Sequence, residues 1–128
     1  MIAVDTNVLV RWILRDDEEQ FQKSRAIIAQ PFFVSWTVIL ELAWVLGSHT
    51  GLDRARQADV LASTLDLPTL HVDRRDRLRW AIERYRHAGD VADLIHIAAS
   101  GDATPFVSFE KKLARQAGPE SPVAIEQV

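Results

Sequence analysis

Short apolar runs alternate along this chain with longer stretches in which apolar residues recur at helical spacing. The short runs predict strands at 2–4, 32–34, within 67–72, at 105–108 and, at the end, 123–125. The longer stretches predict helices at about 7–14, 18–29, 35–47, 53–65, 73–87 and 90–100, with a helical turn at 110–116. Because strands alternate with helices, we expect the α/β class, with a central, mostly parallel sheet of about five strands flanked by helices.

Polar residues at the edges of these segments predict where the helices begin. Asp53 and Asp90 are expected as N-caps, since a short carboxylate side chain can accept a hydrogen bond from the first turn. Asp73 is expected to open an arginine-rich helix, and Ser35 or Thr37 to open the helix after the second strand.

The composition is that of an ordinary globular protein. With 128 residues, 48% of them hydrophobic and 26% charged, the chain is expected to form a single domain spanning 1–128. It has no cysteine, which excludes disulfides and thiolate metal sites and fits a cytoplasmic location. Its first residues do not resemble a signal peptide, and no stretch is apolar enough to cross a bilayer, so we expect no membrane partner.

Two acids lie within strongly apolar segments. Glu41 is the only Asp, Glu, Lys or Arg between Arg25 and Asp53, and we expect its helix to be buried in the core. A buried carboxylate needs a partner, so Glu41 is a candidate functional residue unless a distant arginine neutralises it. Asp5 follows the first strand, where α/β proteins place their sites; alternatively it is a helix N-cap, a role that Thr6 or Asn7 could fill equally.

Two further acids are expected at the same edge of the sheet. Asp93 would be the third residue of a helix capped by Asp90, where an acid also stabilises the helix dipole. Glu110 follows the fourth strand and could equally open a helical turn. His96 shares the helix of Asp93, and we interpret it as a half-buried structural residue, because the histidines show no zinc-binding spacing.

Oxygen ligands of this kind favour hard cations such as Mg²⁺ or Mn²⁺. Such an ion can bind a phosphate and activate a water molecule, so clustered carboxylates indicate hydrolysis of phosphodiester bonds. The polar residues Thr6, Asn7 and Ser108 could orient ligands or water molecules around the ion.

The formal net charge of −3 is weak evidence against a nucleic-acid partner, because eight of the fifteen basic residues lie between 54 and 86. These arginines could hold an RNA backbone. Alternatively, they form a solvated helix face with ion pairs to Asp73, Asp76 and Glu83. The eight are Arg54, Arg56, Arg74, Arg75, Arg77, Arg79, Arg84 and Arg86.

Taken together, four segments make the chain resemble the PIN domain family, and within it the VapC-type toxins of toxin–antitoxin modules. Val4-Asp5-Thr6-Asn7-Val8-Leu9 is similar to the opening signature of the family. The segments around Glu41 and Asp93 are similar to those that carry its second and third acids. The segment 106–113 is similar to the fourth, but Ser108 replaces the usual threonine and Glu110 the usual aspartate.

The resemblance implies an Mg²⁺- or Mn²⁺-dependent endoribonuclease acting on structured RNA. It implies a catalytic and metal-binding set of Asp5, Glu41, Asp93 and Glu110, in which Glu110 has one methylene more than the usual aspartate and so reaches further. Asp90 is a further acid that could assist. The resemblance also implies a homodimer held inactive by a VapB-type antitoxin. The toxin would contact DNA only indirectly, through the DNA-binding part of that antitoxin.

Two other functions stay open. A catalytically degenerate PIN-like module would bind RNA or a protein without cleaving, and Glu110 would mark the decayed site. A phosphoacceptor receiver domain has the right size, but it requires paired acids after the first strand, where Asp5 stands alone, and a lysine near the C-terminus, where none follows Lys112.

Overall fold

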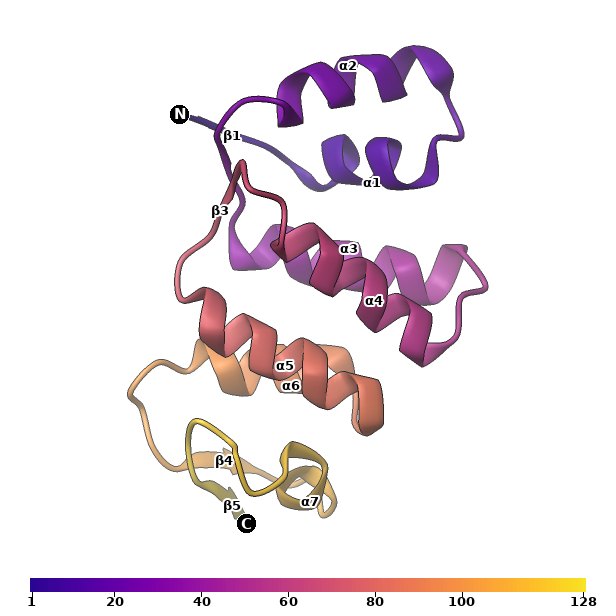
Figure 1. Cartoon of the computed structure of the whole chain (residues 1–128). Helices are drawn as coiled ribbons and strands as arrows, with labels where there is room; N and C mark the ends of the chain where they lie inside the picture. The colour runs from indigo at the N-terminus through magenta and orange to yellow at the C-terminus, as the bar shows by residue number, and fades with distance from the viewer.

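A computed structural model describes all residues, 1–128, and confirms the α/β class (Figure 1). Every expected strand and helix is present. The strands are β1 (Ile2–Ala3), β2 (Phe32–Phe33), β3 (Leu70–His71), β4 (Phe106–Ser108) and β5 (Ile125–Gln127). The helices are α1 (Thr6–Leu14), α2 (Glu18–Ile28), α3 (Trp36–His49), α4 (Arg54–Leu65), α5 (Arg75–His87), α6 (Val91–Ala99) and α7 (Leu113–Ala117).

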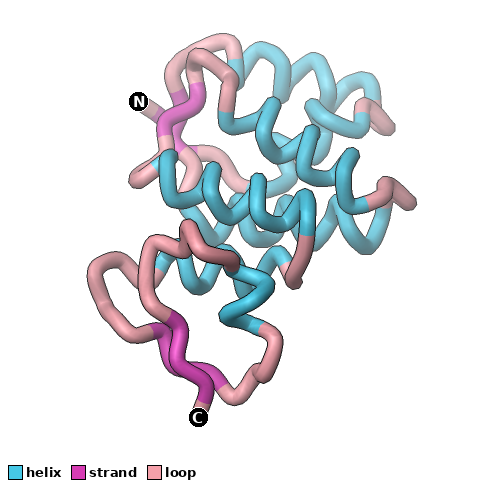
Figure 2. Tube along the Cα trace, turned by 60° about the horizontal axis from the view of Figure 1, so that its bottom comes forward, coloured by secondary structure: helices cyan, strands magenta, loops and turns pink.

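The five strands are all parallel to their neighbours, but they form two sheets instead of one. The first sheet has the order β1-β2-β3, with Ile2 opposite Phe32 and Phe32 opposite Leu70. The second pairs β4 with β5, with Phe106 opposite Ile125. Two views place the sheets at opposite ends of the molecule (Figures 1 and 2). The expected central sheet is therefore divided, and β1 and β4 each pair on one side only.

The helices stack in layers, from α1 and α2 through α3 and α4 to α5 and α6 (Figure 1). The apolar faces of these layers merge into one core of 23 buried residues. Phe32, Leu42, Leu78 and Leu94 are among its fully buried side chains and come from four different elements. None of the helices is long and apolar enough to span a bilayer.

Side-chain caps set the start of most helices, as the sequence predicts. Asp53 accepts from the Arg56 amide at 2.9 Å, and Ser35 is the cap of α3. The expected role of Asp73 is wrong: α5 begins after Arg74, which has a left-handed backbone with φ of 49° and makes no side-chain cap. The Asp73 carbonyl instead accepts a hydrogen bond from the Trp36 indole at 2.8 Å, which ties the end of β3 to the start of α3.

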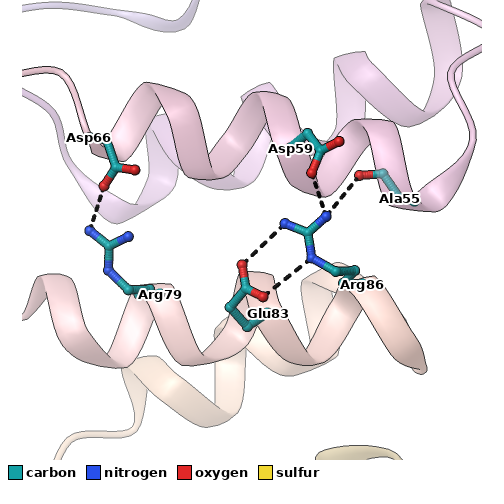
Figure 3. Close-up of polar contacts among 6 residues, drawn as sticks. All are labelled: Ala55, Asp59, Asp66, Arg79, Glu83 and Arg86. Carbon is teal, nitrogen blue, oxygen red and sulfur yellow. Dashed lines mark hydrogen bonds and ion pairs between the residues drawn. The ribbon is translucent and has the colours of Figure 1, made fainter.

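Several of the clustered arginines join α5 to α4 (Figure 3). Arg86 is bound by Glu83 on its own helix and by Asp59 and the Ala55 carbonyl on α4. Nearer the start of α5, Arg79 forms an ion pair of 2.8 Å with Asp66 at the end of α4.

Other members of the cluster donate to backbone carbonyls. Arg75 binds the Leu65 and Leu70 carbonyls, and Arg54 binds those of Tyr85 and Gly89. Among the eight clustered arginines, Arg56 alone makes no side-chain hydrogen bond or ion pair, and of the three acids expected as partners only Glu83 serves. The cluster mainly holds helices and loops together, which favours the structural interpretation over RNA binding.

Candidate functional site

Asp5 lies just beyond β1 and is the N-cap of α1, accepting from the Val8 amide at 3.3 Å. Its side chain is exposed and lines a hollow of about 310 Å³ between α1 and α2. Arg11 and Lys23 line the same hollow, as does Asn7. Neither Arg11 nor Lys23 was predicted from the sequence as a site residue. The four-residue spacing from Asn7 to Arg11 was the available signal, because it places both on one helix face.

Thr6, directly after Asp5, is buried with 8% of its surface exposed. Its Oγ1 is the only buried side-chain polar atom without a hydrogen-bond partner. Buried hydroxyls are almost always hydrogen-bonded, so the Thr6 hydroxyl is free to bind a ligand or a water molecule next to the candidate acid Asp5.

Glu41 is exposed, contrary to the expectation that its helix is buried on all sides. Helix α3 buries one face, made of Ile39, Leu42, Ala43 and Leu46. It turns Glu41 outward, together with Trp44, which is 62% exposed. The carboxylate therefore needs no buried partner, and desolvation is no argument for its function.

Asp90 and Asp93 lie as the sequence predicts at the start of α6. Asp90 caps the helix by accepting from the Asp93 amide at 3.0 Å. Burial raises the pKa of the Asp93 carboxyl above its ordinary value, and the nearby charges of Asp90 and Glu110 raise that pKa further. His96, which is exposed and not half-buried as expected, opposes the shift. Three acids from two segments thus share one electrostatic environment.

Glu110 is positioned by the turn that follows β4. The Ser108 hydroxyl accepts from the Glu110 amide at 3.0 Å, and the Glu110 carboxylate accepts from the Lys112 amide at 3.2 Å. Both are short-range contacts within the turn, so Ser108 organises the backbone that presents Glu110. The intervening Phe109 is 84% exposed.

The oxygen atoms of these residues are suitable ligands for a hard cation, but the side chains lie too far apart to bind one together. No three acidic or histidine side chains are gathered closely enough to bind a metal ion. The charges of Asp90 and Glu110 both act on the Asp93 carboxyl, whereas Asp5 caps α1 and Glu41 projects outward from α3.

A comparison with protein families identifies the family of this chain. Residues 2–118 match the PIN domain family, which is more than nine-tenths of the chain. The chain belongs to the PIN domain family. PIN domains are generally nucleases that act on nucleic acids and typically use divalent metal ions. Neither a comparison with curated proteins nor one with solved structures gives a match.

The PIN match begins at β1 and ends at Gly118, so it includes Asp5, Glu41, Asp93 and Glu110. It leaves out β5, the only partner of β4. The edge strand that pairs with β4 thus lies outside the matched region, whereas β4 and the Glu110 turn lie inside it.

Proposed function

We propose that this chain is a PIN-type, metal-dependent endoribonuclease that hydrolyses phosphodiester bonds in structured RNA, with 1–128 acting as one nuclease domain. The observation that carries the proposal is the match of residues 2–118 to the PIN domain family, whose members typically use divalent metal ions. Asp93 and Glu110 supply oxygen ligands that suit such an ion, and burial together with the charges of Asp90 and Glu110 raises the pKa of the Asp93 carboxyl.

The catalytic and metal-binding set in this proposal is Asp5, Glu41, Asp93 and Glu110, with Mg²⁺ or Mn²⁺ as the cation. Thr6, Asn7, Asp90 and Ser108 support that set. The free Thr6 hydroxyl and the Ser108 contact to the Glu110 turn agree with these roles. The four acids do not meet in the arrangement described above, so the site has to be completed before an ion can bind.

We further propose that the protein is the VapC-type toxin of a toxin–antitoxin pair in the cytoplasm. It would form a homodimer, be inhibited by a VapB-type antitoxin, and reach DNA only through that antitoxin. The supporting observation is apolar surface available to a protein partner, of which Trp44 on α3 is the largest side chain.

A second function is favoured by one specific observation. Because no three donors are gathered, the chain would also suit a catalytically degenerate PIN-like module that binds RNA or a protein. Such a module would bind without metal-dependent cleavage.

The test is incubation of the purified protein with total RNA in Mg²⁺ or in Mn²⁺, with EDTA in a parallel sample. Asp93→Asn removes the proposed ligand, and Asp76→Asn makes the same charge change at an exposed residue in the first turn of α5 as a matched control. Discrete fragments that disappear with EDTA and with Asp93→Asn, but persist with Asp76→Asn, would support the nuclease. Intact RNA in all samples, from folded protein, would favour the binding module.

A further inference from the structure

The hollow between α1 and α2 is lined mainly by side chains that donate hydrogen bonds. Arg11 and Lys23 bring two positive charges to it. Asn7, Gln20 and Ser24 add uncharged groups, each with an N–H or O–H to donate. At about 310 Å³ the hollow has the size of a small ligand site. A lining with this excess of donors is typical of a site that binds an anion.

The helical repeat directs these donors to one place. Gln20, Lys23 and Ser24 are three and four residues apart on α2, so they share one face of that helix. Asn7 and Arg11 are four residues apart on α1, which packs beside α2 (Figure 1). The donors therefore stand on two packed helices, which hold a site more firmly than a loop would.

Ser24 gives independent evidence for a ligand. Only 4% of this residue is exposed, and its hydroxyl makes no hydrogen bond within the chain. The Thr6 hydroxyl is the only fully buried side-chain group without a partner, so the Ser24 hydroxyl must be open to solvent. It opens into the hollow, because that is the space which Ser24 lines. A buried residue with a free hydroxyl directed into a hollow is placed to bind a ligand there.

The two cations keep donors free for such a ligand. Arg11 binds both carboxylate oxygens of Asp16 at 3.0 Å, but through Nη1 alone, so its Nε and Nη2 groups have no partner. The Lys23 ammonium group pairs with Glu19 at 3.3 Å, and the two side chains are 71% and 81% exposed. Such an exposed pair contributes little, so a ligand can replace it. Neither Asp16 nor Glu19 lines the hollow.

The position of Asp5 indicates which anion the hollow binds. Asp5 is the only carboxylate in the lining, and it belongs to the proposed catalytic set. Its charge opposes a free anion, but an RNA strand held at the catalytic set carries further phosphates beside the one that reacts. Most of the arginines between 54 and 86 are engaged in contacts within the fold, so the strand needs cations from elsewhere.

We propose that the hollow between α1 and α2 binds a backbone phosphate of the RNA substrate beside the bond that is cleaved. Arg11 and Lys23 pair with the charge of this phosphate, and Ser24 donates a hydrogen bond to it. Asn7 and Gln20 supply uncharged donors around it. The location of the cleaved bond rests on the proposed function, whereas the phosphate contact itself requires no catalysis.

The first test measures the affinity for a short single-stranded RNA by fluorescence anisotropy, in EDTA and at several salt concentrations. Lys23→Gln removes one phosphate contact, so we expect about tenfold weaker binding. The slope of log K against log salt should also fall by about 0.7. Arg25→Gln is the matched control, because Arg25 is an exposed cation of α2 that does not line the hollow.

Arg25→Gln should keep the affinity and the salt slope of wild type. Equal losses in Lys23→Gln and Arg25→Gln would show a general attraction between charges, and the proposal would be wrong. A folded wild type that binds no RNA would overturn it as well.

The second test changes the hollow without removing a cation. Ser24→Ala should bind RNA about fivefold more weakly, with an unchanged salt slope. Its free energy of unfolding in urea should equal that of wild type, since the hydroxyl has no partner in the protein. Wild-type affinity in Ser24→Ala, or a loss of stability without a loss of affinity, would mean that Ser24 is only a structural residue.

Gln20→Glu places a negative charge in the hollow and should weaken binding by about tenfold or more. Glutamate is favourable at the third position of a helix, so the fold should stay intact. Gln30→Glu makes the same change at an exposed residue outside the hollow and should bind like wild type. Equal binding by the two variants would contradict a phosphate in the hollow.

The third test identifies the source of the anion by competition. Inorganic phosphate and a polyglutamate peptide are added at the same concentration of charged groups as unlabelled RNA, and we expect only the RNA to displace the probe. Displacement by phosphate that is lost in Lys23→Gln and Ser24→Ala would make the hollow a site for a free ion. The same pattern with the peptide would assign it to an acidic protein partner. Either result would overturn the proposal.

Cleavage in Mg²⁺ separates this proposal from that of the nuclease. Lys23→Gln and Ser24→Ala should raise KM by about five- to tenfold and change kcat by less than about twofold, because they hold a phosphate that does not react. A fall in kcat at constant KM would contradict this role. If wild type cleaves no RNA, the nuclease proposal fails, and the anisotropy measurements still decide whether the hollow binds a phosphate.

Discussion

Asp5 has a structural role in α1 as well as its proposed catalytic one, and two substitutions separate them. Asparagine caps a helix about as well as aspartate, whereas alanine cannot accept the hydrogen bond from the Val8 amide. Loss of a cap costs about 0.5–2 kcal/mol. The contact here is long, at 3.3 Å, and exposed, so Asp5→Ala should cost about 1 kcal/mol, near the lower half of that range.

Asp5→Asn should cost only about 0.3 kcal/mol, because it keeps the cap and loses the interaction of the charge with the helix dipole. Urea unfolding followed by circular dichroism, in EDTA, would measure both free energies of unfolding, and the RNA assay would be run in parallel. Both variants should lack cleavage while differing in stability. If Asp5→Asn is as destabilised as Asp5→Ala, the carboxylate charge beside Arg11 and Lys23 matters more than the cap. Full cleavage by Asp5→Asn would show that Asp5 is only a cap.

Three further changes probe other parts of the structure. The raised pKa of Asp93 means that the native state binds the proton of this carboxyl more tightly than the unfolded state does. The carboxyl therefore stabilises the fold most below its ordinary pKa of 3.8, and this contribution is lost as the pH rises through the raised pKa. In EDTA, the stability of Asp93→Asn relative to wild type should therefore increase from about pH 4 toward neutrality, and a pH-independent difference would contradict the shift. Gly118→Ala should destabilise by about 1–2 kcal/mol in thermal melts, because φ is +80° and a Cβ there would lie 2.9 Å from the Arg84 guanidinium carbon. The control Gly51→Ala, with φ of +71° but open space around it, should lose less, and equal losses would refute the role of the close contact. Arg86→Met should cost about 1 kcal/mol in urea unfolding by removing the link between α4 and α5, and a salt-independent or absent loss would show that its ion pairs are not stabilising.

Helix boundaries and part of the site were predictable from local chemistry. Asp53 and Asp90 act as caps because a hydrogen bond from a side chain to an amide three residues later depends only on neighbouring sequence. The proximity of Asp93 to Asp90 follows from the same local geometry. The family match then confirms the PIN resemblance that the four acidic segments predicted.

Features that depend on tertiary packing were not predictable in this way. The apolar composition of α3 suggested burial on all sides, but packing decides which face is covered, and Glu41 and Trp44 lie on the open one. Hydrophobic pattern identifies strands without naming their neighbours, so the division into two sheets could not be foreseen. Asp73 is a good cap by composition, yet the left-handed backbone of Arg74 moves the start of α5 beyond its reach.

The order in which the layers follow the chain has a consequence for synthesis. Each helical pair packs mainly against the next one in sequence, and the first sheet is complete once His71 has been made. Contacts of short sequence separation form quickly, and N-terminal parts of a chain can fold while the rest is still being translated. The growing polypeptide therefore acquires its scaffold, with Asp5 and Glu41 already in place, before the ribosome adds Asp93 and Glu110. A nuclease built in this order would gain its last two acids only after this scaffold has been made.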